Sequence, residues 1–474
     1  MDCSLQGVRG SVPAYGPGTL RCSKKLILMK ERKALRSTDV LHFPVDIVYK
    51  QCDDKWVVVS PETANWIVLE SEEQKILMNR LIEGQTVGDV YSEAERSGII
   101  TEYKRLLAAI SARQFANEDG VPAADIIQDF DTLNIYLTNA CNLRCKHCFV
   151  KAGKALANEL TENEWCSVLQ DFYSLGGRTI TITGGEPALR SDFASIVRKA
   201  HTIGLNVTVL TNGILWNAEM ISALAPYISE VQISLDGVDE MMNAQIRGEG
   251  FFEKIKKTII AFANAGVHTS VSTTFTLETM DENTAEKYQN LIVSINKESD
   301  APVHFKLSTK ILPGRDISYT AEQNERYLKE INRIQGMVNT VNTYDFFMEN
   351  HSPNTIIKNC GYGGLSIRAD GEVFFCNRIL DLDSCGNIRD NALEYFIRQG
   401  KLAYEKTDVN HMQPCKDCYL KYFCGGGCRI DECNFKGKLH DSCGELRNLT
   451  CSPEKKQRLL RKMMDSYLYK YHFK

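Results

Sequence analysis

Three cysteines share one loop in the stretch Thr138-Asn139-Ala140-Cys141-Asn142-Leu143-Arg144-Cys145-Lys146-His147-Cys148. Thiolates spaced by three and two residues can wrap one iron–sulfur cubane. A [4Fe–4S] cluster has four irons, so three cysteine ligands leave one iron open to a non-protein ligand. Zinc is the alternative, but it needs a fourth protein ligand, and His147 lies awkwardly between two of the thiols. The loop therefore predicts an iron–sulfur site.

Strands and helices alternate on the carboxyl side of this loop. Runs rich in β-branched residues predict strands at 132–138, 178–183, 206–211, 230–235, 267–275 and 303–308. Apolar residues at helical spacing predict helices near 161–175, 191–203, 217–226, 251–265, 281–297 and 321–336. Six βα units predict an α/β fold, with a parallel sheet either open or curled into a partial barrel. Chemistry in such folds lies at the carboxyl ends of the strands.

Further motifs follow the later strands. Cys-x3-Cys-x2-Cys after the first strand of such a chain resembles the radical S-adenosylmethionine (SAM) superfamily, with His147 where that family usually has an aromatic residue. Strand 178–183 ends in Gly184-Gly185-Glu186-Pro187, which resembles the family's Gly-Gly-Glu-Pro motif. Glycines let the backbone approach a ligand, and a carboxylate accepts from an ammonium. Asn212, Ser234 and Arg247 are weaker candidates, for which an ordinary turn or a solvated charge is the alternative.

This resemblance implies a reaction. In the family, the open iron chelates the amino and carboxylate groups of SAM, and the reduced cluster passes an electron to the sulfonium. The resulting 5′-deoxyadenosyl radical abstracts hydrogen from the substrate. The resemblance thus implies a partial (β/α)6 radical-SAM barrel whose SAM contacts are His147, Gly184, Gly185, Glu186, Pro187, Asn212, Ser234 and Arg247.

Cysteine is concentrated after this region. The chain has 17 cysteines, and ten of them lie between residues 360 and 451. In a short secreted chain this density predicts disulfides, but in a long chain without a secretion signal it predicts metal sites. Asp370-Gly371 predicts a hairpin turn that places Cys360 and Cys376 at opposite ends of paired strands. The run Cys415-x2-Cys418-x5-Cys424-x3-Cys428 then passes through three glycines, where bare backbone can approach sulfide.

The cysteine pattern resembles the SPASM domain, a twin-cluster extension of radical-SAM enzymes, over roughly 355–446. The resemblance implies two auxiliary [4Fe–4S] clusters, one held by Cys360, Cys376 and Cys428, the other by Cys415, Cys418, Cys424 and a later cysteine. We expect Cys443 to be the later ligand, because Asp441-Ser442-Cys443 resembles the family's Asp-Pro-x-Cys ending. Cys433 and Cys451 are the alternative ligands, and zinc is the alternative metal. The chain is thus expected to hold three [4Fe–4S] clusters and SAM.

A small unit of strands followed by helices lies at 40–116. Its pattern predicts strands at 45–49, 55–59 and 65–69, and helices at 72–81, 87–97 and 102–115. It resembles the winged-helix-like peptide-recognition domain typified by the pyrroloquinoline-quinone biosynthesis D protein, whose sheet edge takes a leader peptide as an extra strand. An appendage that binds no peptide is the alternative. The expected domains are a flexible arm (1–34), this domain (35–118), the radical SAM core (125–345), the SPASM domain (346–451) and a C-terminal helix (452–474).

The composition narrows the class of protein. Hydrophobic residues make up 43% of the 474 residues and charged residues 24%, so the chain can bury a core and fold. The net charge of −4 (56 Lys+Arg against 60 Asp+Glu) argues against a nucleic-acid partner. A membrane span needs about 18 consecutive apolar residues, and no stretch of the sequence approaches this length. Residues 1–10 hold no apolar signal region. We expect a cytoplasmic protein with no membrane partner.

Enzymes with the SPASM extension modify peptides or proteins. In sulfatase maturases an aspartate follows the hairpin's second cysteine, but here the residue is Asn377, which has no basic carboxylate. We therefore expect an oxidoreductase that forms a thioether cross-link in a ribosomal precursor peptide. If only Cys360, Cys376 and Cys428 hold the first auxiliary cluster, its open iron could bind the substrate thiolate. Carbon–carbon cross-linking, epimerisation and formylglycine formation are the alternatives.

The reaction implied by the resemblance also needs a source of electrons. An external donor such as flavodoxin or ferredoxin is the expected partner besides the precursor peptide. A non-catalytic iron–sulfur electron carrier is the alternative from a different class of protein. The Gly184–Pro187 motif and the SAM-type cysteine loop argue against that alternative.

Overall fold

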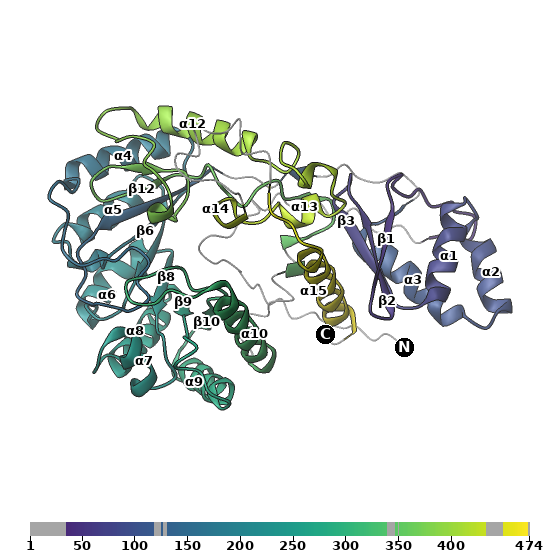
Figure 1. Cartoon of the computed structure of the whole chain (residues 1–474), viewed down its shortest axis with the longest axis horizontal. Helices are drawn as coiled ribbons and strands as arrows, with labels where there is room; N and C mark the ends of the chain where they lie inside the picture. The colour runs from purple at the N-terminus through teal and green to yellow at the C-terminus, as the bar shows by residue number, and fades with distance from the viewer. Residues whose placement is uncertain are drawn as a thin grey trace, which may run out of the picture.

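The structure is a computed structural model that describes residues 35–117, 125–126, 130–338, 347–348, 350–432 and 449–472. The predicted arm at 1–34 lies outside the described residues, as do Cys433 and Cys443. Figure 1 shows a β/α body at one end, a small N-terminal domain at the other, and the cysteine-rich segments between them. Across the described ranges, no helix combines the length and the apolar character needed to cross a membrane.

The β/α body is built on an eight-stranded sheet in the order β10-β9-β8-β7-β6-β5-β12-β13. Six neighbouring strands are parallel: β5 (Thr132–Thr138), β6 (Thr179–Gly184), β7 (Asn206–Thr211), β8 (Glu230–Ser234), β9 (His268–Thr273) and β10 (Val303–Leu307). The helices that follow them are α4 (Glu162–Ser174), α5 (Phe193–Thr202), α6 (Ala218–Leu224), α7 (Glu240–Arg247), α8 (Phe252–Asn264), α9 (Thr284–Glu298) and α10 (Ala321–Met337). The sheet stays open because β10 is an edge strand. The predicted α/β fold with a partial barrel is confirmed.

One face of this sheet forms the core. Ile180 and Ile182 of β6 pack with Val207 and Val209 of β7 against the helices. Threonines occupy the alternate positions of β6, because successive side chains of a strand point to opposite faces. The helices cover the outside of the curled sheet in Figure 1, so its inner face is the more polar one.

A hairpin from the cysteine-rich region extends the same sheet. Its strand β12 (Ser366–Ile367) pairs parallel to β5 and antiparallel to β13 (Val373–Phe374). The predicted turn is present, with Gly371 at φ +91°. The prediction that Cys360 and Cys376 lie at opposite ends is wrong, because an antiparallel hairpin brings its two outer ends together. Gly363 N–H donates to Phe375 O at 2.9 Å, and the Cys360 thiol contributes to the raised pKa of Cys376.

The N-terminal domain has strands β1 (Val48–Cys52), β2 (Lys55–Ser60) and β3 (Asn65–Leu69) in one antiparallel sheet, followed by α1 (Glu72–Ile82), α2 (Val87–Arg96) and α3 (Ile100–Arg113). The first strand starts three residues later than predicted. Asp46 leads into it by accepting a 2.7 Å hydrogen bond from Ser60 Oγ, and Val45 is 99% exposed.

Both faces of this small sheet are covered. Val58 and Ile67 pack with the helices α1–α3. Val57 and Trp66 point the other way and pack against α15 (Pro453–His472) and a cysteine-rich segment through Leu420, Phe423, Leu460, Met463, Met464 and Tyr467. The remaining elements of that segment include η3 (Ile379–Asp381), α12 (Leu393–Lys406), α13 (Lys421–Cys424) and α14 (Arg429–Glu432).

Candidate functional site

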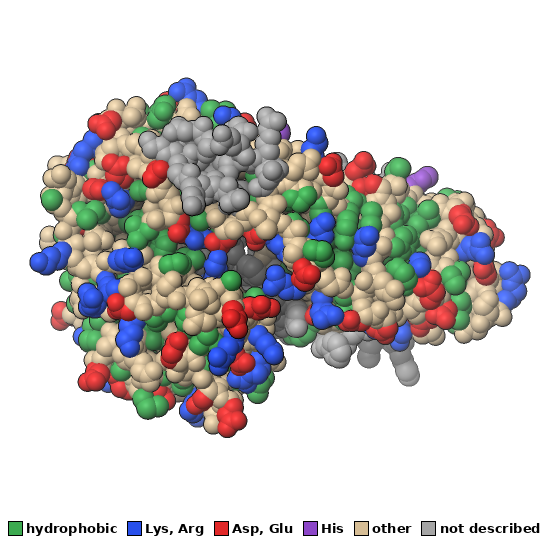
Figure 2. Space-filling view, viewed as in Figure 1, with side chains coloured by type: hydrophobic (Ala, Val, Ile, Leu, Met, Phe, Trp, Pro, Cys, Tyr) green, Lys and Arg blue, Asp and Glu red, His purple; other side chains and the backbone are tan. Residues whose placement is uncertain are grey.

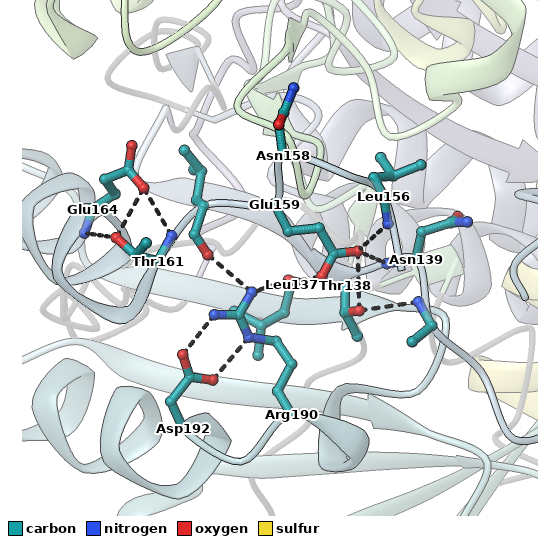
Figure 3. Close-up of polar contacts among 12 residues, drawn as sticks. Leu137, Thr138, Asn139, Leu156, Asn158, Glu159, Thr161, Glu164, Arg190 and Asp192 are labelled. Atoms are coloured by element: carbon teal, nitrogen blue, oxygen red, sulfur yellow. Dashed lines mark hydrogen bonds and ion pairs between the residues drawn. The ribbon is translucent and has the colours of Figure 1, made fainter. Parts of the chain in front are cut away.

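The end of β5, just before the cysteine loop, is held by one carboxylate. Glu159 Oε1 accepts from the N–H groups of Asn139 at 2.8 Å and Leu156 at 3.0 Å, and from Thr138 Oγ1 at 3.1 Å (Figure 3). The Thr138 hydroxyl in turn accepts from Ala140 N–H at 3.0 Å. The chain direction into Cys141 is therefore fixed by hydrogen bonds to a residue that sequence reasoning did not identify.

Arg190 ties β5 to the segment that follows β6. Its Nη1 donates to the carbonyls of Leu137 at 3.1 Å and Leu160 at 3.0 Å, while Nη2 donates to Asp192 Oδ2 at 2.6 Å (Figure 3). Two buried carbonyls and a carboxylate thus share one guanidinium, a geometry that the planar fork of arginine suits. The ends of β5 and β6 are thereby held side by side.

Gly184 and Gly185 allow the two strand ends to approach each other. A Cβ on Gly184 would lie 2.3 Å from Thr138 O, and one on Gly185 would lie 2.1 Å from Ala140 O. Gly185 N–H donates to Thr138 O at 2.7 Å, and Glu186 N–H donates to Ala140 O at 2.8 Å. In this structure the glycines are needed for backbone-to-backbone contact with the residues preceding Cys141. The predicted motif lies directly against the cysteine loop.

Glu186 is fully buried at the carboxyl ends of β6 and β7. Its carboxylate accepts from Thr211 Oγ1 at 2.8 Å, Asn212 N–H at 2.8 Å and Ala188 N–H at 3.2 Å. Burial raises the pKa of Glu186, and these hydrogen bonds oppose that rise. Asn212 Nδ2 also donates to Asn142 Oδ1 at 2.8 Å, so the end of β7 contacts the cysteine loop itself. Pro187 is buried at the first position of the turn η1 (Pro187–Leu189).

A buried ion-pair network lies on the other side of the loop. Asp236 Oδ2 lies 2.7 Å from Arg247 Nη2 and 3.1 Å from His147 Nε2. Arg247 Nη1 donates to Cys145 Sγ at 3.8 Å. Burial opposes ionisation of Asp236, but Arg247 and His147 hold the pKa of this carboxyl down to about 2. Sequence reasoning identified His147 and Arg247 but did not foresee the carboxylate that joins them; Ser234, which ends β8, lies two residues before it.

Three buried donors in this region have no hydrogen-bond partner within the part of the chain that the structure describes. They are His147 Nδ1, Arg247 Nε and Asn243 Nδ2. An unpaired buried donor is costly, so a ligand that offers acceptor atoms would be stabilised there. A nucleoside with carboxylate and amine groups, such as SAM, has acceptors for these atoms and an ammonium for a carboxylate such as Glu186. The residues present therefore fit SAM.

The thiols of the loop fit a cluster. Burial raises the pKa of the Cys141 thiol to about 11, and Cys145 and Cys148 add to the rise. Cys148 N–H donates to Cys145 O at 3.3 Å, and Leu143 N–H donates to Cys141 Sγ at 3.5 Å, so the loop turns back on itself around these cysteines. Burial likewise raises the pKa of Cys145, which Arg247 opposes. Within the described ranges, no group of three or more His, Cys, Asp or Glu side chains is arranged to hold a single metal ion. The irons of a cubane are separate atoms, so its thiolates are spaced more widely than those around one zinc ion.

A segment after β10 closes over the loop. Arg315 Nη1 donates to Cys145 O at 3.2 Å, and its Nη2 donates to Ala152 O. Asp316 N–H donates to Lys146 O at 2.7 Å, and a Cβ on Gly314 would lie 2.6 Å from the His147 backbone. These residues were not predicted to belong to the site. Gly314-Arg315 carries no family motif that would have shown it.

The first C-terminal cysteine group lies at the barrel. Burial raises the pKa of Cys376 to about 12, with further contributions from Cys360 and Cys428. Arg378, two residues after Cys376, donates to Cys428 Sγ at 3.7 Å, so the segment that carries Cys376 lies against Cys428. The hydroxyl of Tyr136, on β5, donates to Asn377 O. Cys376 is therefore joined through its neighbour to the same strand that leads into the Cys141 loop.

The second C-terminal group contains Cys415, Cys418, Cys424 and a fourth thiol. Burial raises the pKa of Cys415 to about 11, and Cys424, Cys418 and Cys451 each contribute. Cys451 also contributes to the raised pKa of Cys424. Leu449 N–H, two residues before Cys451, donates at 2.5 Å to the carbonyl of Gln413, which lies two residues before Cys415, so the backbone brings the segment of Cys451 to that of Cys415. Cys443, the predicted ligand, lies outside the described residues.

Residues 135–292 match the family model of the Radical SAM superfamily. The sporulation killing factor maturation protein SkfB of Bacillus subtilis (strain 168) is 32% identical over 246 residues, which are 51% of this chain and 59% of that protein. The mycofactocin maturase MftC of Mycolicibacterium smegmatis is 27% identical over 308 residues, 62% of this chain and 76% of that protein. An AdoMet-dependent heme synthase of Oleidesulfovibrio alaskensis is 24% identical over 340 residues, 66% of this chain and 84% of that protein.

A solved structure, Streptococcus suis SuiB bound to S-adenosylmethionine, is 16% identical with a TM-score of 0.47 and covers 82% of this chain and 96% of that one. The family match begins on β5 and ends on α9, so it includes Cys141, Cys145, Cys148 and the Glu186 and Arg247 contacts described above. Residues 135–292 of this chain therefore form a Radical SAM domain.

Proposed function

We propose that this protein is a radical SAM peptide maturase that forms a thioether cross-link in a ribosomal precursor peptide. The observation that carries the proposal is the cysteine loop enclosed by buried Glu186 on one side and by the Asp236–Arg247–His147 network on the other. Two of the relatives, SkfB and MftC, are named as a maturation protein and a maturase.

Cys141, Cys145 and Cys148 would hold the first cluster, and Glu186, Arg247 and His147 would hold SAM. The bound cluster supplies the single electron that cleaves SAM. Around it, Asp236 keeps Arg247 and His147 in position, and the contacts of Arg315 and Glu159 keep the loop in one conformation. Iron ligation takes thiolates, so loading the cluster would release the protons that burial favours on Cys141 and Cys145.

Two auxiliary clusters would occupy the C-terminal cysteine groups. Cys360, Cys376 and Cys428 would hold one, and the contact of Arg378, two residues after Cys376, with Cys428 Sγ supports this. Cys415, Cys418 and Cys424 would hold the other. We propose Cys451 as its fourth ligand because the backbone hydrogen bond from Leu449 to Gln413 holds its segment against that of Cys415. An external flavodoxin- or ferredoxin-type donor would reduce the protein.

The N-terminal domain would bind the leader of the precursor peptide on one sheet edge. On β3 the outward groups of Trp66 are already bonded, its N–H to Asn65 Oδ1 at 2.8 Å and its carbonyl to Arg113 Nε at 3.1 Å. On β1, the two-residue turn after Cys52 makes Cys52–Lys55 a hydrogen-bonded pair, so Tyr49 and Gln51 direct their backbone groups outward. The leader would therefore add along β1, where Figure 2 shows hydrophobic side chains reaching the surface of this domain.

A thioether is favoured over formylglycine because Asn377 stands beside Cys376 and has no basic carboxylate. The first C-terminal group lies next to Tyr136 on β5, so a peptide cysteine at the carboxyl end of the barrel would lie near both cysteine groups. Forming the S–C bond would transfer one hydrogen atom from the peptide carbon to the 5′-deoxyadenosyl radical. The thiol would lose a proton, and the remaining electron would pass to an auxiliary cluster. The product is two hydrogens lighter and has one fewer free thiol.

The test uses the full chain, reconstituted and reduced without oxygen, with SAM and a precursor peptide encoded close to its gene. We expect 5′-deoxyadenosine, a loss of two hydrogens per cross-link, and the loss of one alkylatable cysteine for each. The variant with Cys141, Cys145 and Cys148 all changed to Ala should lose about four irons and all SAM cleavage. Two-hydrogen loss with every thiol still alkylatable would show carbon–carbon cross-linking, and an unchanged mass would leave epimerisation.

A further inference from the structure

Arg378 lies between two carboxylates and one cysteine sulfur. Its Nε donates to Asp381 Oδ2 at 2.7 Å, and its Nη1 donates to Asp431 Oδ1 at 2.6 Å. The same Nη1 donates to Cys428 Sγ at 3.7 Å. The side chain is 14% exposed, so its position depends on these partners more than on solvent.

Asp431 connects this arrangement to the barrel. Its second oxygen, Oδ2, lies 2.9 Å from the ammonium of Lys310 in the segment that follows β10. Asp431 is on α14, three residues after Cys428, and Arg378 is two residues after Cys376. The Asp431 carboxylate therefore links Arg378, which lies near Cys376, to Lys310 at the carboxyl end of the barrel. Asp431 itself lies near Cys428 in the chain.

We propose that Arg378 is a positioning residue that fixes a positive charge against the Cys428 sulfur and thereby tunes the first C-terminal cluster. This inference rests on the proposed function, because it requires that Cys360, Cys376 and Cys428 hold a cluster. A cluster gains negative charge when it is reduced, and a donor to a ligand sulfur stabilises the reduced form. Arginine remains protonated, so the charge is permanent.

The same chain offers a matched control. Arg368 lies in the β12–β13 hairpin that precedes Arg378, and it also pairs with a carboxylate. Its Nε donates to Asp370 Oδ1 at 2.9 Å, and its Nη2 donates to Asp370 Oδ2 at 2.7 Å. Its guanidinium contacts Asp370 and the ring of Phe374, and among the residues that the structure describes it bonds to no cysteine. Changing Arg368 therefore removes an arginine–aspartate pair of the same kind from the same segment without removing a contact to sulfur.

The experiment is a redox titration followed by electron paramagnetic resonance on the full reconstituted chain, with iron counted in every sample. The signal of the first C-terminal cluster is identified by its loss in Cys376→Ala. We expect Arg378→Gln to shift the midpoint potential of that signal to lower values, Arg378→Lys to shift it less, and Arg368→Gln to leave it in place. If Arg378→Gln loses iron, the midpoint potential is compared between the unaltered protein and Arg378→Lys, which keeps the charge.

Equal potentials in the unaltered protein and the Arg378 variants, at equal iron content, would overturn this inference and leave the proposed function standing. An equal shift in Arg368→Gln would also overturn it, because the effect would then be one of overall charge. Absence of the Cys376-dependent signal from the unaltered protein would overturn the proposed cluster itself.

Discussion

Asp236 Oδ2 lies 2.7 Å from Arg247 Nη2, and both side chains are buried, at 1% and 8% exposure. A buried charge without a partner is far more costly than the pair, so each residue depends on the other. Because Arg247 also contacts Cys145 Sγ, the ion pair connects the core of the barrel to the cysteine loop. The variants below separate stability, SAM binding and iron binding.

Asp236→Asn should destabilise the protein by about 3–5 kcal/mol, because it leaves Arg247 buried without a counter-charge. The measurement is denaturant or thermal unfolding of the iron-free chain. Asp281→Asn is the control: Asp281 pairs with Lys287 at 3.2 Å, with both side chains more than 40% exposed, and such a pair contributes about 0–1 kcal/mol. Equal destabilisation by both changes would contradict the role given to Asp236.

Glu186→Gln should weaken SAM binding roughly 10- to 100-fold while leaving the iron content unchanged. The amide removes the charge that an ammonium would meet, and a hydrogen bond to a charged group contributes about 1.5–3 kcal/mol. Calorimetric titration of the reconstituted protein with SAM measures this. Glu298→Gln, on the exposed surface of α9 where the carboxylate pairs with Lys256, should bind SAM as the unaltered protein does. Unchanged affinity in Glu186→Gln would remove this residue from the SAM site.

Cys451→Ala should reduce the iron content of the reconstituted chain by up to about four irons. Cys443→Ala, made and reconstituted in parallel, should retain the iron. The reason is the hydrogen bond from Leu449 N–H to Gln413 O, which holds the segment of Cys451 against that of Cys415. Iron and sulfide analysis decides between the two cysteines, and the opposite pattern would restore Cys443 as the ligand.

Gln51→Pro should abolish leader binding without unfolding the domain. Proline lacks the N–H that an added strand would use, and it is tolerated on an edge strand where that N–H points outward. Fluorescence titration of the full chain with a labelled leader gives the affinity, and circular dichroism checks the fold. Gln51→Thr keeps the N–H and should bind normally. A leader that binds Gln51→Pro with undiminished affinity would show that the peptide does not add to β1.

Met463→Ala should cost about 2–5 kcal/mol, because Met463 is fully buried between α15 and the N-terminal sheet. Faster amide hydrogen exchange in 55–69 would report the loosened contact. Met241→Ala provides the comparison, since Met241 is 70% exposed and its truncation should change stability by no more than about 0.5 kcal/mol. Unaltered exchange in 55–69 would mean that α15 does not support the sheet.

The sequence patterns were sufficient for the six parallel strands but not for the sheet's far edge. Strands β5 to β10 are runs of β-branched residues bounded by turns, and their order follows from alternation with helices. Strand β12 has only two residues, and its partner Asn134 is far away in the chain, so no local pattern indicates the pairing. Helix α12 was not predicted, although Leu393, Phe396 and Ala403 have helical spacing. The many cysteines on both sides of it predict metal sites and say nothing about a helix between them.

At the site too, residues within a local motif were predictable and residues without one were not. Glu186 was predictable because a motif of four residues carries it. Glu159, Asp236 and Arg315 are single charged residues whose partners lie elsewhere in the chain, and only folding brings them together. Spacing alone left Cys433, Cys443 and Cys451 as alternatives, since it says nothing about which loop returns to the cluster.

The packing of α15 on the N-terminal sheet has a consequence for biosynthesis. Trp66 and Val57 are translated long before Met463 and Tyr467, which cover them. Until α15 is made, part of one apolar face of this domain has no cover, even though its helices α1 to α3 are complete and Leu420 and Phe423 are already present. A nascent chain stalled before residue 453 would present that part of the face to chaperones.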